Sequence, residues 1–275
     1  MLRSLLIGLD GSEDNEGAWE LGLRWAKAHD AVAVGVAVAE EPDILTTEAA
    51  LLFDTDASAP EPLPRRLRVR AHEAIGPFAR RAEEVGVRRE VIEAVGSPWA
   101  RIIEEAERHD LIVLGRQTHF EFGSGSHGDE TVIKVIRAAP RPVVTVLRAP
   151  AGGEAAVVAY DGSLQAARAL HAFEASGLAR AGPVHVVGVS SDGAGAIRGV
   201  DRAVAFLRSH DIDARPVAIR SDRDPAGAIL EQVDRLGAGL LVMGAYGQPA
   251  LREFLLGSVT RTALRECAAP VFCYH

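Results

Sequence analysis

The sequence predicts an α/β fold with two open, doubly wound parallel sheets in tandem, each of five strands with helices on both faces. Short apolar runs alternate with segments of helical periodicity, which is typical of right-handed βαβ units. The apolar runs are mostly continuous, as in Val184–Val189, and this suits parallel strands that are covered on both faces. The same order of strands and helices then returns in the second half of the chain.

An internal repeat supports the tandem arrangement. Leu6–Ser12 aligns without gaps on Val157–Ser163, and Asp110–Gly115 aligns on Gly239–Gly244. Each copy closes with an Ala-Pro pair and a short apolar run. Because the opening and closing marks agree in order and type, we interpret the chain as two copies of one unit.

A linker separates the two copies. The 275 residues allow two domains of ordinary size, and Ala149–Gly153 has linker composition. We therefore expect domains at 1–149 and 153–275.

A long segment, Glu40–Pro64, is rich in Pro, Asp and Ala and occurs only in the first copy. We expect it to be partly ordered and without a chemical role.

The elements follow from the same patterns, taken in order. In the first copy we expect strands near 3–9, 31–39, 87–93, 110–115 and 142–147, and helices near 13–29, 65–85, 97–109 and 129–139. In the second we expect strands near 155–160, 183–189, 213–219, 239–243 and 270–274, and helices near 163–180, 196–210, 225–236 and 258–267.

Composition excludes several classes of protein. A net charge of -8 and a pI near 5.6 disfavour a strongly electrostatic binder of nucleic acid or of anionic membranes.

The apolar start Met1–Asp10 is too short for a signal peptide, and no run is long enough for a transmembrane helix, so we expect a cytoplasmic protein. Cys267 and Cys273 are the two cysteines, which we expect to be reduced and buried.

An Asp-Gly-Ser motif follows the first strand of each copy, at Asp10 and at Asp161. Ligands of open α/β sheets bind at the carboxyl ends of the strands, where such a carboxylate can bond a ribose hydroxyl or help hold a divalent cation. The alternative is a helix N-cap, because Asp, Gly and Ser all begin helices well.

A second motif follows the fourth strand of the second copy. Gly244 and Gly247 are three residues apart, and Gly257-Ser258 follows after nine more residues. Glycines let the backbone approach a phosphate, successive main-chain N–H groups form an anion-binding concavity, and a helix N-terminus favours an anion. The alternative is a glycine-rich turn followed by a serine cap.

The spacing Gly244-x2-Gly247-x9-Gly257-Ser258, together with Asp161, resembles the ATP-binding signature of the universal stress protein family. The resemblance covers the whole chain as a tandem pair. It implies a five-stranded parallel sheet of order 3-2-1-4-5 in each copy, with helices on both faces. It also implies that family domains pair through their last strands, so that 143–146 would face 271–274 within one chain.

The resemblance implies ATP, with Mg²⁺, as the ligand. Asp161 would approach the ribose and the metal-bound phosphates, Val189 would meet the adenine through its main chain, and Arg252 would either add charge or be a solvated loop residue. The full binding set implied is Asp161, Gly162, Val189, Met243, Gly244, Gly247, Arg252, Gly257, Ser258 and Val259. No catalytic residue and no metal-ligand set is assigned.

The first copy departs from this pattern. Thr118 stands where a glycine is expected, and Asp129 stands where the serine is expected. Two like unit charges about 4 Å apart repel by roughly 1 kcal/mol in water and by more at a lower dielectric. We therefore predict a degenerate first loop, in which Asp10 and Gly115 are relics and Asp129 serves as a helix N-cap. The nearby His119, Glu121 and His127 match no metal-ligand spacing.

These patterns favour an ATP-binding stress-response regulator or sensor that binds one ATP per chain and hydrolyses it slowly at most. An assembly module that needs no nucleotide is the alternative. An enzyme of the ATP-pyrophosphatase class is disfavoured, because that class carries a Ser-Gly-Gly-type loop where this chain has Asp-Gly-Ser. No general base is evident. We expect two tandem chains to form a homodimer.

Overall fold

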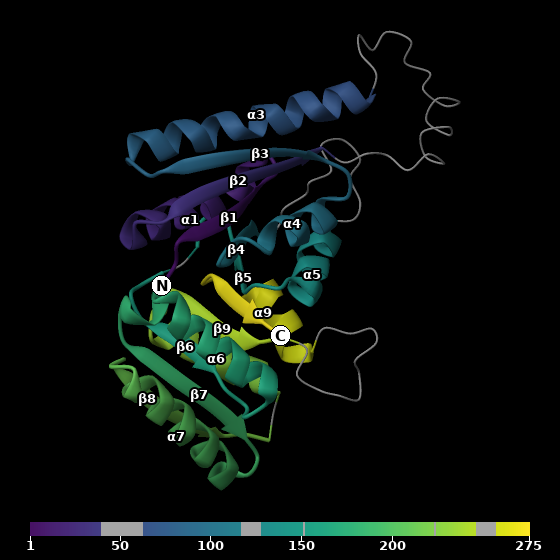
Figure 1. The fold of residues 1–275 in the computed structure, drawn as a ribbon. Helices are drawn as coiled ribbons and strands as arrows, with labels where there is room; N and C mark the ends of the chain where they lie inside the picture. Colours follow the sequence, from purple (N-terminus) through teal and green to yellow (C-terminus); the bar gives the residue numbers. More distant parts are fainter. Residues whose placement is uncertain (40–62, 117–127, 151, 223, 246–256) are drawn as a thin grey trace, which may run out of the picture.

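The ten strands form one continuous sheet in the order β3-β2-β1-β4-β5-β10-β9-β6-β7-β8 (Figure 1). The computed structural model describes residues 1–39, 63–116, 128–150, 152–222, 224–245 and 257–275. Within each half the strand order is the predicted 3-2-1-4-5, and all neighbours inside a half are parallel. The predicted fold class is therefore confirmed, and the two five-stranded sheets join edge to edge.

The N-terminal half contains five strands and the helices between them. Its strands are β1 (Ser4–Leu9), β2 (Val32–Ala39), β3 (Arg89–Val95), β4 (Leu111–Gly115) and β5 (Val143–Val146). Its helices are the 3-10 helix η1 (Glu13–Asn15), α1 (Glu16–His29), α3 (Leu63–Glu84), α4 (Pro98–Ala106) and α5 (Gly128–Ala138). The helix expected near 13–29 thus begins with a 3-10 turn, and α5 begins at Gly128, so Asp129 is its second residue rather than its cap.

The C-terminal half repeats this plan. Its strands are β6 (Ala156–Ala159), β7 (Val184–Ser190), β8 (Ala214–Arg220), β9 (Leu240–Gly244) and β10 (Val271–Tyr274). Its helices are α6 (Leu164–Ser176), the 3-10 helix η2 (Leu178–Arg180), α7 (Gly193–Ser209), α8 (Pro225–Arg235) and α9 (Ser258–Glu266). Helix α7 begins three residues before the expected start, because the Asp192 carboxylate accepts hydrogen bonds from Ala194 N and Gly195 N.

The two halves meet through their last strands. Strands β5 and β10 are antiparallel, with Val143 opposite Cys273, Val144 opposite Phe272 and Thr145 opposite Val271. This is the pairing that the family resemblance implied, and it lies at the middle of the molecule in Figure 1. The two termini lie beside the same junction (Figure 1).

Two hydrophobic cores cover the two faces of the sheet, and each core runs through both halves. One contains residues of α1, α3, α6 and α7, among them Phe78 and Phe173. The other contains residues of α4, α5, α8 and α9, among them Ile102 and Ile229. Successive strand residues alternate between the faces. Each of the two cores is therefore continuous across the joint between the halves.

The outermost strands differ from the rest. Side chains of β3 and β8 are mostly exposed or partly exposed, so these two strands are not covered on both faces as the central strands are. Both carry charged residues, and β8 also contains Pro216. Charges and proline at a sheet edge discourage pairing with another chain.

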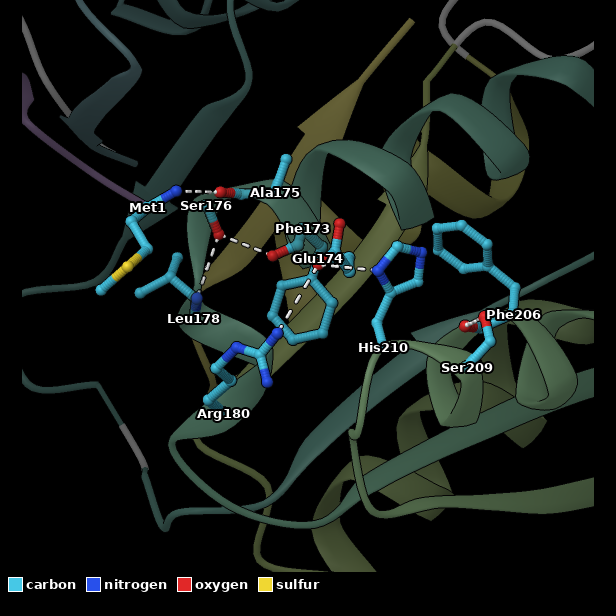
Figure 2. Close-up of polar contacts among 10 residues, drawn as sticks. All are labelled: Met1, Phe173, Glu174, Ala175, Ser176, Leu178, Arg180, Phe206, Ser209 and His210. Carbon is cyan, nitrogen blue, oxygen red and sulfur yellow. Dashed lines mark hydrogen bonds and ion pairs between the residues drawn. The ribbon is translucent and has the colours of Figure 1, made fainter.

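A second contact between the halves lies at the start of the chain (Figure 2). The Met1 ammonium donates a hydrogen bond to the Ala175 carbonyl, and Leu2 N donates to the Ser176 carbonyl at 3.1 Å. In the same region, Glu174 Oε1 lies 3.4 Å from His210 Nδ1. The amino terminus is therefore fixed against the end of α6.

Among the described residues, no helix combines the length and the hydrophobicity needed to cross a bilayer.

Candidate functional site

The carboxyl ends of β6, β7 and β9 bring several of the predicted binding residues, Asp161, Gly162, Val189, Met243 and Gly244, to one edge of the sheet. Ala159, the last residue of β6, pairs with Val187 of β7 on one side and with Met243 of β9 on the other. The chain therefore reverses its strand order beside β6, and this is where open α/β sheets bind ligands. Asp161 and Gly162 follow β6 directly.

Asp161 is exposed at this edge. Its Oδ1 accepts a hydrogen bond from Ser163 N at 2.9 Å, and within the described chain its Oδ2 has no partner. The N-cap of α6 is Ser163, whose Oγ accepts from Ala166 N at 3.1 Å. The helix is thus capped by the serine and not by the aspartate. Gly162 between them has φ +81°, a backbone conformation that favours glycine.

Asp10, the matching residue of the N-terminal half, has different surroundings. It is only 4% exposed, and its Oδ1 accepts hydrogen bonds from Ser12 N at 2.9 Å and Ser12 Oγ at 2.8 Å. Asn15 is also buried, and its side-chain amide Nδ2 donates a hydrogen bond to the carbonyl of Gly8 in β1. The Asp10 carboxylate therefore stabilises its own loop, whereas Asp161 is exposed and has an oxygen that the described residues do not bond.

Gly244, the last residue of β9, has a packing role. A Cβ built there would lie 2.5 Å from Ala166 N and 2.6 Å from Gln165 C, in the first turn of α6. A glycine is therefore required for the backbone of α6 to cross β9 this closely. The sequence pattern had suggested close approach to a phosphate as the reason for this glycine, and the structure supplies a reason within the fold itself.

Gly257, before the first residue of α9, has no such role. Its φ is -53°, and among the described residues a Cβ there would meet only Thr260 Oγ1, at 3.9 Å. Ser258 at the start of α9 is exposed and Val259 is partly buried. The amino end of α9 thus presents main-chain N–H groups and a hydroxyl to solvent, an arrangement that suits an anion.

The remaining predicted residues lie around the same edge or outside the described chain. Val189 is partly exposed near the end of β7, and Met243 is 4% exposed on β9. Gly247 and Arg252 lie outside the described residues, as do Thr118, His119, Glu121 and His127. Within the described ranges, no group of three or more His, Cys, Asp or Glu side chains is placed to hold a metal ion.

Both cysteines are buried and free, as the sequence predicted. Cys267 follows α9, and Cys273 is on β10. Burial raises the pKa of Cys273 to about 12, so this thiol is neutral at physiological pH. Burial likewise raises the pKa of Cys267.

Sequence reasoning missed Arg116. This residue directly follows β4 and Gly115, yet it is 7% exposed and its guanidinium donates hydrogen bonds to the carbonyls of Cys267 and Ala269. Both acceptors belong to the C-terminal half. A charged residue immediately after a buried strand was the available signal, but its partner lies 151 residues away in sequence.

Comparison with known proteins shows the family of this chain. The model of the universal stress protein family matches residues 1–146 and again residues 154–275. This chain belongs to the universal stress protein family. A universal stress protein of Synechocystis is 25% identical over 168 residues, which is 60% of this chain and 58% of that protein.

Solved structures of universal stress proteins share the whole tandem fold. One from Archaeoglobus fulgidus aligns with a TM-score of 0.73 and 21% identity over 98% of this chain and 95% of its own. One described as a putative universal stress protein from Pseudomonas aeruginosa aligns with a TM-score of 0.61 and 18% identity over 99% and 93%. At these identities the likeness establishes the fold.

Proposed function

We propose that this universal stress protein binds one ATP, with Mg²⁺, through its C-terminal half, and acts as an ATP-binding regulator or sensor in a stress response. The contrast between Asp161 and Asp10 carries the proposal. Asp161 is exposed with a carboxylate oxygen unused by the described chain, whereas Asp10 is 4% exposed and bonded to Ser12. Of these two aspartates, only Asp161 has a carboxylate oxygen that the described chain leaves available for a ligand.

The amino end of α9 would hold the phosphates. Gly257 and Ser258 are exposed there. Gly257 has no positive φ, and no backbone of the described chain approaches it closely enough to require a glycine. Free N–H groups and the helix dipole at this end attract an anion. Mg²⁺ is commonly held by one or two carboxylates together with substrate phosphates, and Asp161 fits this role. Bound Mg²⁺ would neutralise part of the phosphate charge.

The other predicted residues complete this set. Val189 and Met243 lie at the ends of the strands on either side of β6. Gly162, Gly244, Gly247, Arg252 and Val259 belong to the same proposed binding set. We propose further that the halves are domains with bounds 1–149 and 153–275, and that the first carries a degenerate loop because of Thr118 and Asp129.

Hydrolysis in this proposal is slow at most, because the sequence offers no evident general base to activate water. The protein would act in the cytoplasm and associate as a homodimer of tandem chains. Sedimentation equilibrium at two protein concentrations tests the homodimer: a mass equal to that of one chain at both concentrations would contradict it.

Calorimetric titration of Mg-ATP into the nucleotide-stripped full chain tests the binding proposal. We expect one site per chain. Asp161→Asn should weaken binding about tenfold or more, since a hydrogen bond to a charged group contributes about 1.5–3 kcal/mol. Ser258→Asp should weaken it further, because like charges about 4 Å apart repel by about 4 kcal/mol at a surface dielectric near 20.

Two matched variants serve as controls. Asp213→Asn removes an exposed carboxylate that precedes β8, at the opposite edge of the sheet. Ser97→Asp adds the same charge at the exposed N-cap of α4. Both should bind like the unsubstituted chain. Two sites per chain would contradict the degenerate first half, and no binding at millimolar Mg-ATP would favour the nucleotide-independent assembly module.

A further inference from the structure

The two halves are related by a local two-fold arrangement at the joint, but the contacts across it are unequal. Arg116 and Ala245 hold matching places, because each follows the last residue of β4 or β9 and donates its main-chain N–H to the end of the neighbouring strand. The bond from Arg116 N to the Val146 carbonyl is 2.7 Å, and that from Ala245 N to the Tyr274 carbonyl is 2.8 Å. Only the N-terminal copy has a charged side chain here.

The Arg116 side chain crosses the joint to the end of α9. Its guanidinium donates to the carbonyl of Cys267, the C-cap of α9, and at 2.9 Å to the carbonyl of Ala269. Helix C-termini leave carbonyls without intrahelical partners, and a cation there also complements the dipole. Arg116 therefore caps a helix that belongs to the other half.

Burying the Arg116 guanidinium costs stability, because its charge has no ionised partner in the described part of the chain. Burial lowers the pKa of Arg116, Nε finds no partner in the described part of the chain, and the nearby Cys267 and Cys273 thiols are neutral because burial raises their pKa values. Replacing a buried charge with an apolar residue is often neutral or stabilising, so stability alone does not account for this one.

Helix α9 has a weak anchor of its own. Its buried residues are Thr260 and Ala263, both small, and Val259 and Leu264 are only partly buried against the same core. Helix α5, its counterpart in the N-terminal half, buries Val132, Val135 and Ile136. The residue of the C-terminal half that matches Arg116 is Ala245, which offers α5 no charged side chain. The helix with the smaller apolar anchor is thus the one held by the arginine. A helix of nine residues is about 13 Å long, so holding its carboxyl end limits where its amino end lies.

We propose that Arg116 is a positioning residue for the nucleotide site of the C-terminal half. By holding the carboxyl end of α9 from the N-terminal half, it sets the place of Gly257 and Ser258 at the amino end. This inference rests on the proposed function, since it assigns a supporting residue to the same site. It gives the N-terminal half a part in ligand binding although that half need not bind ligand itself.

The test compares Mg-ATP affinity in the full chain and in four variants. Arg116→Met keeps the length of the side chain and removes its donors, and Arg116→Lys keeps the charge. Tyr274→Phe removes the 3.3 Å hydrogen bond from Tyr274 Oη to the Pro140 carbonyl, which crosses the same joint beyond the end of α5. Phe78→Leu lowers stability by changing a fully buried side chain of α3, away from α9.

We expect Arg116→Met to raise the Kd by roughly three- to thirtyfold, the range of coupling effects carried through packed elements. Arg116→Lys should recover part of the loss, and Tyr274→Phe and Phe78→Leu should stay within about twofold of the unsubstituted chain by the same reasoning. Without nucleotide, the α9 amides should exchange hydrogen faster in Arg116→Met than in Phe78→Leu, compared at denaturant concentrations that equalise global stability.

The outcomes separate the two claims. Unchanged affinity in Arg116→Met, or equal loss in Phe78→Leu, overturns the positioning role and leaves the proposed function standing. Unchanged exchange of the α9 amides in Arg116→Met also overturns the positioning role. Absence of binding by the unsubstituted chain overturns the proposed function and the positioning role together.

Discussion

Val144 and Phe272 lie directly opposite each other at the centre of the antiparallel pair that joins the two halves. Both are fully buried. The flanking pairs are symmetric about them, because Val143 and Val271 each follow the last proline of their copy. Phe272 also meets Phe173 edge to face, with ring centroids 6.0 Å apart. One aromatic side chain therefore contributes both to the joint and to the core beneath α6.

We expect Phe272→Ala to lower the free energy of unfolding by about 3–5 kcal/mol, the usual cost of removing a buried phenyl ring. Urea denaturation followed by circular dichroism measures the change. Ile197→Ala is the control, because Ile197 is 50% exposed and its loss should change stability by no more than about 0.5 kcal/mol. Equal effects of the two substitutions would show that the joint contributes little.

Gly244 and Gly257 of the candidate site should respond differently to substitution by alanine. Gly244→Ala places a methyl group 2.5 Å from Ala166 N, so we expect a loss of about 1–3 kcal/mol in stability. Within the described chain, the methyl group of Gly257→Ala makes only an ordinary contact, at 3.9 Å, with Thr260 Oγ1, so stability should change by no more than about 0.5 kcal/mol while Mg-ATP affinity falls. Urea unfolding together with calorimetry checks both effects. Gly257→Ala with full affinity would argue against phosphate binding there.

Stability should fall below about pH 6.5 partly because of His109. Burial lowers the pKa of His109 from 6.5, and Arg108 acts in the same direction, whereas Glu105, Glu90 and Asp110 oppose them. The unfolded chain therefore takes up a proton near pH 6.5 that the native state resists. Its contribution to stability is fully present above this pH and is lost as pH falls toward the lowered native pKa.

Urea unfolding at pH 7.5 and 5.5 measures this effect, and His109→Gln should reduce the difference between them. His29, His185 and His275 also have pKa values lowered by burial, so part of the pH dependence should remain. An unchanged pH dependence in His109→Gln would mean that His109 accepts a proton in the native state as readily as in the unfolded chain.

The two thiols should be unreactive while the protein is folded. Cys273 has its pKa raised to about 12 by burial, and Cys267 is equally inaccessible at 1% exposure. Reaction requires the thiolate and access to it. We expect Ellman's reagent at pH 8 to titrate almost no thiol in the native protein and both after denaturation. Rapid reaction of one thiol in the native protein would indicate that α9 or β10 opens locally.

The sequence predicts the fold well because the fold depends on local patterns and on a repeat. The apolar runs place all ten strands within a few residues, and the repeat together with the family resemblance gives the pairing of 143–146 with 271–274. The apolar runs alone do not give the order of the strands, but the order 3-2-1-4-5 implied by the family resemblance places β3 and β8 at the outer edges, where the structure has them.

The candidate site is less predictable because identical motifs have different surroundings. Asp10 and Asp161 share the Asp-Gly-Ser motif, yet one is buried and the other exposed. Gly244 fits a phosphate-loop pattern, but the reason for it includes the crossing of α6. The bond from Arg116 to Cys267 joins residues of different halves, so no local pattern contains it. Tertiary contacts decide all three, and only the structure gives them.

The antiparallel joint has a consequence for how the protein assembles. Because one short linker connects β5 to β6, the strands β5 and β10 meet within a single chain, at an effective concentration on the order of millimolar. Dilution therefore does not separate these two strands. The two halves are also always present in equal number. Each half can therefore accumulate substitutions of its own without losing its partner.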